Sequence, residues 1–494
     1  MHDGNLSSWC RIVRYSGDRF SQGLWTVLAL LALIMVPGVS AREVATVRGR
    51  VTNLTMNPLE GVRVRVAGED VRTETDSAGR FSLQIPLEPE DSGATEESLS
   101  ARAVAVRDEL ELTKSGFKPR EVHVYDASES LDITLYGIDE KIPVIYSSDL
   151  YHPHHDPDDH FDLATIYALS ELDIKHIILD NAHGGQDENP GTVPVRQMNH
   201  ITGRSIPTAV GLGEALESPT DRALDQPERW QQGVRRIIEI LRESPRKVTI
   251  ITVGSVRDVA AAYNREPELL RRKVDRLLIF IGNATTDPPP PDKMFRGMEY
   301  NAALDPLAYA RIMKSDLPVY WAPCFGTHGY TTIWRARRTD LLRHAPDPVK
   351  RFFFFMWEKN RKADPIGYIS RDVERSVPKG DRWMWCCAVF AWLGGRRFVR
   401  TGGESQYRAV SSLQAEDRES LKPFGFRAFE VTTEIKDSKE GPIVRTRFKG
   451  KTEQSHRIMV FEKHMPSRRL GSEYASIMTS VTARLLGELG RTEE

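Results

Sequence analysis

Ser148-Asp149-Leu150-Tyr151 and Asp156-Pro157-Asp158-Asp159 are the two stretches that decide the fold of the largest domain in this sequence. They follow the apolar run Ile142-Pro143-Val144-Ile145-Tyr146, which predicts a buried strand, and they precede residues 163–169, which predict a helix. Open α/β sheets bind their ligands at the carboxyl ends of the strands. We therefore expect a functional site where four carboxylates gather, namely those of Asp149, Asp156, Asp158 and Asp159.

Carboxylates held this close together repel one another and shift one another's pKa values. A hard divalent cation relieves that repulsion, and Ca²⁺ or Mg²⁺ prefers carboxylate oxygen, so the pattern predicts a metal site. Four histidines stand among the aspartates, and this mixture also suits a transition metal. Alternatively, they are exposed loop residues that balance the acidic charge: His152, His154, His155 and His160.

The length and charge of the chain limit its class. A chain of 494 residues is too long for one core, so two or three domains are expected. With 68 Lys and Arg against 69 Asp and Glu, the chain has no basic excess of the kind that nucleic-acid binding leaves. The sequence predicts four parts: a signal peptide at 1–41, a β-sandwich at 44–138, an α/β domain at 142–402 and an α+β extension of that domain at 403–494.

The N-terminus has the features of a secretory signal peptide. Arg11, Arg14 and Arg19 precede the apolar run 24–36, and small residues follow at 37–41. An uncleaved membrane anchor is the alternative, although the run is short for a membrane span, and no other segment approaches that length. We expect the mature chain to be secreted or periplasmic, with no membrane span after signal removal.

Cysteine usage argues against a disulfide framework. Of the four cysteines, Cys10 leaves with the signal peptide, and Cys324 and the vicinal pair Cys386-Cys387 remain. An odd number with one vicinal pair indicates that packing, not cross-linking, stabilises the exported chain.

Residues 44–136 alternate apolar and polar side chains with turn signals at short intervals, which predicts a small β-sandwich. Four stretches, in order, resemble the carboxypeptidase regulatory-like domain, a transthyretin-like or Ig-like sandwich. They are Gly49-Arg50-Val51, Pro58-Leu59-Glu60-Gly61-Val62, Thr75-Asp76-Ser77-Ala78-Gly79-Arg80-Phe81 and Gly116-Phe117-Lys118-Pro119. The resemblance implies a binding, spacing or docking module without chemistry of its own.

From residue 143 onward, short apolar runs alternate with amphipathic segments, which predicts a mostly parallel sheet covered by helices on both faces. The expected strands lie at 174–179, 248–253, 277–281 and 319–322, and the expected helices at 230–243, 256–263 and 306–314.

Five motifs of this region, in order, resemble the inosine–uridine preferring nucleoside hydrolases. The family's aspartate motif D-x-x-x-D-D is similar to Asp149 with Asp156-Pro157-Asp158-Asp159, after an insertion around 152–155. The other four resemblances are carried by 252–260, by Ile281-Gly282-Asn283-Ala284, by Glu299-Tyr300-Asn301 with Asp305-Pro306, and by 323–328.

The resemblance implies a Ca²⁺-dependent hydrolase that cleaves an N-ribosyl bond of a nucleoside or riboside with an activated water. It assigns Asp149 as general base and metal ligand, Asp159 as metal ligand, and the carbonyl of Val253 as main-chain ligand. Substrate binding would fall to four side chains: Asp158, Asn283, Glu299 and Asn301.

One departure from the family is pronounced. The late motif H-D-x-x-A, which would supply a further metal-binding Asp and an acid for the leaving base, has no counterpart in residues 382–389. Asp381 lies nearby but out of register, and His328 is one possible substitute for the acid. The glycine–asparagine motif expected after the second strand is matched only by Gly191-Thr192 or by Asn181.

The C-terminal part returns to short elements without a recognisable motif. Strands of an antiparallel sheet are expected at 426–433, 443–448 and 456–461, and an amphipathic helix at 474–489.

Three readings of function remain open at this point. The first is an exported metal-dependent hydrolase of nucleoside hydrolase type. The second is a catalytically degenerate protein that binds a nucleoside or sugar, favoured by the missing His-Asp pair. The third is a metal-dependent phosphoesterase built on the Asp and His cluster. The sequence does not fix the substrate or the oligomeric state.

Overall fold

The computed structural model describes twelve segments of the chain: 44–86, 109–124, 130–181, 189–284, 294–326, 329–359, 364–371, 375–402, 407–411, 420–448, 455–465 and 471–490. The predicted signal peptide and His328 lie outside these residues. None of the helices that the structure describes has the length and apolar character that a membrane crossing requires.

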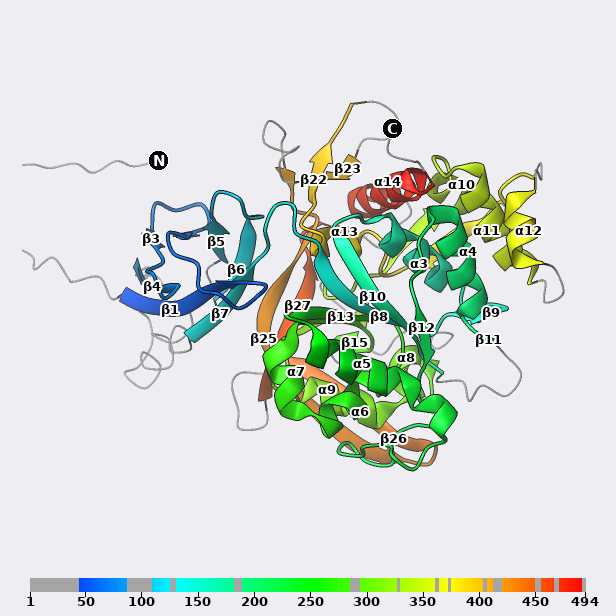
Figure 1. Ribbon diagram of the computed structural model, residues 1–494, viewed down its shortest axis with the longest axis horizontal. Coiled ribbons are helices and arrows are strands. Elements are labelled where there is room, and N and C mark those ends of the chain that lie inside the picture. The colour runs from blue at the N-terminus through cyan, green and yellow to red at the C-terminus, as the bar shows by residue number, and fades with distance from the viewer. Residues whose placement is uncertain are drawn as a thin grey trace, which may run out of the picture.

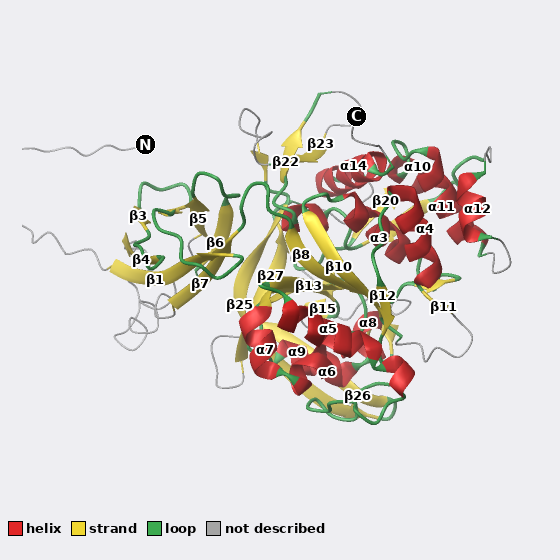
Figure 2. Ribbon diagram, in the orientation of Figure 1, coloured by secondary structure: helices red, strands yellow, loops and turns green. Residues whose placement is uncertain are grey.

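The first described part of the chain is built from two small sheets (Figures 1 and 2). One sheet has the order β4-β1-β7, with β1 antiparallel to β4 and parallel to β7. The other has the order β3-β2-β5-β6. Both contribute to one cluster of buried apolar side chains that includes Val47, Val64, Phe81, Leu110 and Ile133. The bounds are β1 Val44–Asn53, β2 Arg63–Val66, β3 Arg72–Glu74, β4 Arg80–Pro86, β5 Glu109–Thr113, β6 Arg120–His123 and β7 Ser130–Leu135.

A nine-stranded sheet forms the centre of the molecule, in the order β12-β10-β8-β13-β14-β18-β27-β25-β26 (Figure 1). The seven strands from β12 to β27 run parallel to one another. Strand β25 runs antiparallel to both β27 and β26, so the sheet is mixed. The bounds are β8 Ile142–Ser148, β10 Leu172–Leu179, β12 Thr208–Val210, β13 Val248–Thr252, β14 Val274–Phe280, β18 Val319–Ala322, β25 Phe424–Ser438, β26 Gly441–Phe448 and β27 Ser455–Lys463.

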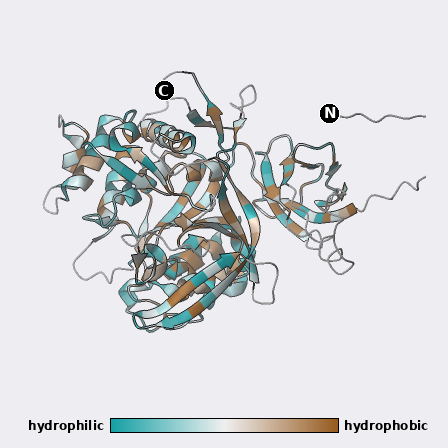
Figure 3. Cartoon of the chain, turned by 180° about the vertical axis from the view of Figure 1, so that it is seen from behind, coloured by the Kyte–Doolittle hydropathy of each residue, from teal (hydrophilic) through white to brown (hydrophobic). Residues whose placement is uncertain are grey.

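Helices cover both faces of this sheet, as the strand–helix alternation predicts (Figure 2). Successive side chains of a strand point to opposite faces. Accordingly, Val144 and Tyr146 of β8 join one buried cluster with α3, α11 and α14, while Ile145 joins the other with α5, α6 and α9. The central strands carry long hydrophobic stretches (Figure 3). The bounds are α3 Asp158–Ala168, α4 Thr192–Thr202, α5 Gln232–Glu243, α6 Arg257–Arg265, α7 Pro267–Lys273, α9 Pro306–Met313, α11 Asp347–Glu358 and α14 Glu473–Glu488.

The C-terminal strands do not form a separate cap. Tyr320 of β18 pairs with Met459 of β27, and this pairing joins β25, β26 and β27 to the central sheet. The structure therefore agrees with an extension of the α/β domain.

Shorter elements surround the sheet and contribute to the site. They are β9 Tyr151–His152, β11 Asn189–Pro190, η2 Glu228–Trp230, β15 Asn283–Ala284, β16 Met294–Phe295, β17 Met298–Glu299, α8 Tyr300–Leu304, β19 Phe325–Gly326, β20 Trp334–Arg337, α10 Arg338–Leu341, α12 Pro365–Ser370, β21 Asp381–Met384, α13 Val389–Leu393, β22 Arg397–Arg400, β23 Tyr407–Val410 and β24 Ser420–Leu421.

Buried polar contacts fix the first part of the chain against the α/β domain. Asp275 of β14 contacts the hydroxyl of Tyr136. Arg120 of β6 lies 3.7 Å from the Asp275 carboxylate. Both side chains of the ion pair are almost completely buried. Lys422, just after β24, adds ion pairs with Glu109 at 3.3 Å and Glu121 at 2.9 Å.

Candidate active site

A cavity of ≈ 330 Å³ opens at the carboxyl ends of the central strands, where the sequence places the site. Carboxylates form one side of it and aromatic rings the other, and we call it the acidic cavity. Its lining residues are Asp149, His155, Asp156, Asp158, Asp159, Asp162, Val253, Phe280, Glu299, Tyr300, Asn301, Cys324, Phe325, Trp385 and Cys386.

Two of the predicted carboxylates lie deep in the acidic cavity. Asp149 follows β8 directly, and Asp159 stands in the first turn of α3, and each is 7% exposed. Burial, and then the charge of Asp180, raises the pKa of Asp149 well above its usual range. Burial and the charge of Asp149 do the same for Asp159. Asp149 Oδ1 is buried and has no hydrogen-bond partner among the described residues.

Asp158 lies beside a cation that the sequence analysis did not assign to the site. The guanidinium of Arg382, on β21, lies 3.0 Å from Asp158 Oδ1 and also contacts Asp156. Burial lowers the pKa of Arg382 to about 10, so it stays protonated near neutral pH. Arg382 therefore brings one positive charge to a cavity lined by six carboxyl groups.

Asp162 is a lining residue that the sequence analysis missed. It stands one turn after Asp158 and Asp159 on α3 and is 2% exposed. Its Oδ1 accepts the backbone N–H of Cys387 at 3.0 Å and the thiol of the same residue at 2.9 Å. The i, i+3 and i, i+4 spacing on one helix face was the available signal.

The thiols of Cys386 and Cys387 lie in the segment that corresponds to the family's late motif. Cys386 lines the acidic cavity together with Cys324, and Cys387 holds Asp162. All three described cysteines are buried and free, and burial raises the pKa of each thiol well above its usual range. These cysteines are therefore neutral thiols and not thiolates at physiological pH.

Val253, Glu299 and Asn301 also line the cavity and are joined by hydrogen bonds. The amide of Asn301 donates to the carbonyl of Val253 at 3.0 Å, which fixes the direction of that carbonyl. Glu299 accepts the backbone N–H of Gly282 at 2.6 Å and of Asn301 at 3.0 Å, and so caps α8. Carboxylate and carbonyl oxygens have further lone pairs, so each group retains capacity to accept a hydrogen bond or bind a cation.

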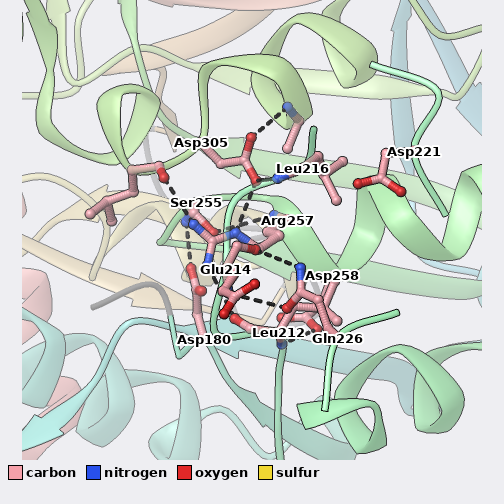
Figure 4. A network of polar contacts seen from close by, with 12 residues as sticks. Asp180, Leu212, Glu214, Leu216, Asp221, Gln226, Ser255, Arg257, Asp258 and Asp305 are labelled. Atoms are coloured by element: carbon pink, nitrogen blue, oxygen red, sulfur yellow. Dashed lines mark hydrogen bonds and ion pairs between the residues drawn. The ribbon is translucent and has the colours of Figure 1, made fainter. Parts of the chain in front are cut away.

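A buried ion pair fixes the turn that carries Val253 (Figure 4). Arg257 donates to Asp305 at 2.9 Å, and their side chains are 2% and 0% exposed. Asp305 also caps α9 by accepting the backbone N–H of Ala308 at 2.9 Å. The motif around 252–260 and the Asp305-Pro306 motif are therefore parts of one scaffold.

Asp180, at the end of β10, holds the same turn from the other side (Figure 4). Its Oδ2 accepts the backbone N–H of Ser255 at 2.6 Å. Gly254 separates Asp180 from Asp149, and a side chain there would overlap Asp180 Oδ2 and lie 3.2 Å from Asp149 Cβ. The adjacent Asn181 accepts a hydrogen bond from the Tyr151 hydroxyl at 3.1 Å.

Asn283 is the predicted substrate-binding residue that does not line the acidic cavity. It lines a neighbouring cavity of ≈ 20 Å³ together with Gly282, Glu299 and Tyr309. Its carbonyl accepts the hydroxyl of Thr446, on β26, at 2.9 Å. Gly282, with a φ of +78°, precedes Asn283 in this structure.

Aromatic rings line the other side of the acidic cavity. Trp385 lies edge-on to Phe325, with ring centroids 6.1 Å apart, and its indole donates to the carbonyl of Cys324 at 2.9 Å. Tyr300 and Phe280 complete this wall. Flat apolar faces of this kind suit a heterocycle or a sugar face.

Four histidines stand among the aspartates. In the described part of the chain, His155 is the one of these four that lines this cavity. The ring of His152 stacks on Phe355 at 4.8 Å. His160 packs against Phe352, and burial lowers its pKa well below the usual range. His154 lies 6.2 Å from His160, ring to ring. The inserted histidines therefore do not act together as one group at the cavity.

The donors in the acidic cavity fit a hard cation by their chemistry. Carboxylate and carbonyl oxygens predominate. The raised pKa values of Asp149 and Asp159 reflect burial first and then repulsion between carboxylates, and a bound cation would relieve that repulsion. Within the part of the chain that the structure describes, no three or more His, Cys, Asp or Glu side chains are gathered closely enough to enclose an ion. The cavity thus offers suitable donors without a preformed cage.

Comparison with known proteins yields consistent similarities. Residues 154–392 match the family model described as inosine-uridine preferring nucleoside hydrolase. The pyrimidine-specific ribonucleoside hydrolase RihA of Citrobacter koseri is 30% identical over 249 residues, which cover 45% of this chain and 73% of that protein. The same enzyme from Salmonella newport is 27% identical over 258 residues, covering 46% and 75%.

Solved structures give a weaker likeness. The inosine-uridine preferring nucleoside hydrolase from Bacillus anthracis aligns at 14% identity with a TM-score of 0.39, over 70% of this chain and 99% of that one. The purine-preferring ribonucleoside hydrolase from Gardnerella vaginalis aligns at 14% identity and a TM-score of 0.40, with the same coverage.

Proposed function

Because the chain belongs to the inosine-uridine preferring nucleoside hydrolase family, we propose that it hydrolyses the N-glycosidic bond of a nucleoside or related riboside in the acidic cavity. Family membership makes it a hydrolase of N-glycosyl bonds. The observation that carries the proposal is the convergence of Asp149, Asp158, Asp159, Glu299 and Asn301 on one cavity that also has an aromatic wall.

Asp149 is the proposed general base. Its carboxylate is buried and has an oxygen without a partner among the described groups, so a water molecule can donate to it. Burial raises the pKa of Asp149, and the cation proposed beside it would oppose that shift and keep the carboxylate ionised, which is the form that accepts a proton. Asp149 would take the proton of the water that attacks the anomeric carbon.

The ribose would be held by the polar side of the cavity. We assign its hydroxyls to Asp158, Glu299 and Asn301, whose oxygens are good acceptors for hydroxyl donors. We assign Asn283 a supporting role behind Glu299. Asp149, Asp159 and the carbonyl of Val253 would hold Ca²⁺, which when bound lowers the pKa of the attacking water and fixes the sugar.

The leaving base would lie against Trp385 and Phe325. The segment 382–389 provides this aromatic surface but no His or Asp to protonate the base. His155 lines the same cavity and its ring packs against Tyr151 at 4.8 Å. We propose that His155 supplies the proton that the base needs to depart as a neutral molecule.

A nucleoside-binding protein without turnover is the second candidate function. It is favoured by the lack of the His-Asp pair in residues 382–389. The phosphoesterase reading would need several histidines at the carboxylates, and His155 is the one found there among the described residues.

We further propose that residues 1–41 direct export of the chain to the cell exterior or periplasm, and that residues 44–138 form a regulatory-like module. The buried contacts of Asp275 with Tyr136 and Arg120 indicate that this module is held in a fixed orientation. It would act as a rigid spacer or docking unit for the hydrolase domain.

The test combines metal-dependent melting with product analysis. The melting temperature of the mature protein is measured in EDTA, in Ca²⁺, and in Ca²⁺ with ribose, since a ligand that binds only the folded state stabilises it. Release of free base from uridine and inosine is followed by chromatography. We expect Ca²⁺ to raise the melting temperature, ribose to raise it further, and at least one nucleoside to be cleaved.

Asp159→Asn is the decisive variant, and Asp437→Asn, at an exposed position of β25, is its matched control. Asp159→Asn should abolish the Ca²⁺ response while the domain still folds, and Asp437→Asn should leave it unchanged. An unchanged Ca²⁺ response in Asp159→Asn would refute the site. Calcium and ribose responses without base release would favour the binding-protein alternative.

A further inference from the structure

A second cavity, of ≈ 400 Å³, lies between β20, α10 and α14 and has no part in the proposed reaction. Helix α14 packs beside α10 and β20 (Figure 2). Three arginines line this cavity and Asp340 is the one carboxylate among its lining residues, so we call it the basic cavity. Its lining residues are Arg335, Ala336, Arg337, Asp340, Arg343, Tyr407, Gly471, Ala475, Ser476, Thr479 and Ser480.

Few carboxylates among the described residues form ion pairs with the arginines of the basic cavity. Arg335 pairs with Asp381 at 3.0 Å and lies over the ring of Trp383, which holds its guanidinium in place. No described carboxylate forms an ion pair with Arg337 or Arg343. Arg343 instead donates to the backbone carbonyl of Asp340 at 3.1 Å. Most of the positive charge is therefore available to a ligand.

More positive charge lies along the same helix. Arg484 of α14 and Arg408 of β23 are close enough to interact. Burial, followed by the charges of Arg408 and Arg343, lowers the pKa of Arg484, and the charge of Glu488 opposes this shift. Like charges that destabilise one another in this way favour a bound anion. The α14 face adjoining them carries the hydroxyls of Ser476, Thr479 and Ser480, which are further hydrogen-bond donors.

We propose that the basic cavity binds the phosphate or pyrophosphate group of a small molecule through Arg335, Arg337 and Arg343. Guanidinium groups present paired N–H donors that match phosphate oxygens in geometry. The site is concave and the chain as a whole has a formal net charge of −1, so the shape and charge favour a compact anion over a nucleic acid or a membrane surface.

This inference does not depend on the proposed hydrolase activity, and its test is a binding measurement on the whole mature chain in EDTA. EDTA removes Ca²⁺ before the titration. An effect of pyrophosphate therefore cannot come from withdrawal of Ca²⁺ from the acidic cavity. Inorganic phosphate and pyrophosphate are titrated by calorimetry and by melting temperature, with sodium chloride at equal ionic strength as the salt control. We expect both anions to bind, pyrophosphate more tightly, and sodium chloride to have no comparable effect.

Two variants decide the assignment. Arg337→Ala combined with Arg343→Ala should weaken pyrophosphate binding by about tenfold or more, because each removes a charge-assisted hydrogen bond. The matched control is Arg63→Ala combined with Arg72→Ala, two exposed arginines of the first part of the chain. Ser476→Glu places a carboxylate in the basic cavity, and it should raise the melting temperature without anion while abolishing pyrophosphate binding.

Equal binding by the double variant and the wild-type chain would overturn the proposal, as would an equal effect of sodium chloride. Binding of heparin or RNA without binding of pyrophosphate would also overturn it, in favour of a polymer surface. A folded Ser476→Glu variant that still binds pyrophosphate would place the anion elsewhere.

Discussion

The guanidinium of Arg382 lies 3.0 Å from the carboxylate of Asp158 at the wall of the acidic cavity, although 224 residues separate the two in the chain. Removal of one partner of a buried ion pair leaves the other charge without compensation. Arg382→Ala should therefore lower stability in EDTA by about 2–4 kcal/mol. It should also tighten Ca²⁺ binding, because the cavity becomes more negative.

The two effects of Arg382→Ala are measured by urea unfolding in EDTA and by Ca²⁺ titration. Arg400→Ala is the control, since Arg400 makes an exposed ion pair with Glu473. Weaker Ca²⁺ binding by Arg382→Ala would contradict the electrostatic role given to Arg382.

Asp162 should contribute to cation binding through its position beside Asp159. Asp162→Asn keeps an oxygen that can accept the N–H of Cys387 but removes the negative charge, so the fold should survive. We expect about tenfold weaker Ca²⁺ binding, seen as a smaller rise in melting temperature. Cys387→Ala, which keeps the carboxylate and loses only the thiol contact, should bind Ca²⁺ normally. Equal affinities of Asp162→Asn and the wild type would assign Asp162 a purely structural role.

Gly254 is required by the spacing of Asp149 and Asp180. A methyl group at this position would overlap Asp180 Oδ2 and crowd Asp149, so Gly254→Ala should lose activity and about 1–3 kcal/mol of stability. Gly402→Ala is the matched control, because nothing lies within 4 Å of a side chain there. Rates on the cleaved nucleoside and unfolding curves check both effects. Normal activity of Gly254→Ala would show that the turn can move without cost to the site.

His155 is tested by changing the leaving group. A purine or pyrimidine base needs a proton to depart, whereas 4-nitrophenolate departs as a stable anion. His155→Ala should slow nucleoside cleavage by about 10²–10⁴-fold and leave cleavage of 4-nitrophenyl riboside nearly unchanged. His152→Ala, at a histidine packed on Phe355, is the control. If His155→Ala slows both substrates equally, His155 positions the sugar and does not act as the acid.

Asp258 should make stability depend on pH. Burial raises its pKa to about 7, while an unfolded Asp titrates near 4, so between these values the folded chain holds a proton that the unfolded chain has lost. This contribution to stability is present at low pH and falls by about 1.4 kcal/mol per pH unit as the pH rises toward 7. Asp258→Asn removes it, so its stability relative to the wild type should be higher at pH 8 than at pH 5. A pH-independent difference in urea unfolding would contradict the raised pKa.

Much of the fold follows from local pattern. The predicted strand at 319–322 is β18 itself, and the strand predicted at 248–253 is β13 with a difference of one residue. Buried parallel strands produce continuous apolar runs, which are readable without knowledge of their neighbours. The antiparallel pairing of β25 with β26 and β27 is also as predicted. The pairing of β27 with β18, which joins these strands to the central sheet, was not readable, because it depends on contacts between distant segments.

The site, like the fold, could be predicted only in part from the sequence. Asp149, Asp158 and Asp159 are close in sequence and follow one strand, so their convergence could be predicted. Arg382 reaches them from β21 through the pairing of β20 with β21, and no local signal reveals that contact. Asn283 follows Gly282, whose φ of +78° turns the chain away from the acidic cavity, and a motif match does not report such a turn.

The pairing of β27 with β18 has a consequence for the order in which the chain is assembled. The strand that covers the open edge of β18 is β27, which follows β18 in the chain only after all the elements from β19 to β26. Until that strand emerges, the catalytic sheet presents an unpaired edge, which is a template for association with other chains. The enzyme domain can therefore be completed only after β27 has been synthesised, well after the strands that carry the acidic cavity.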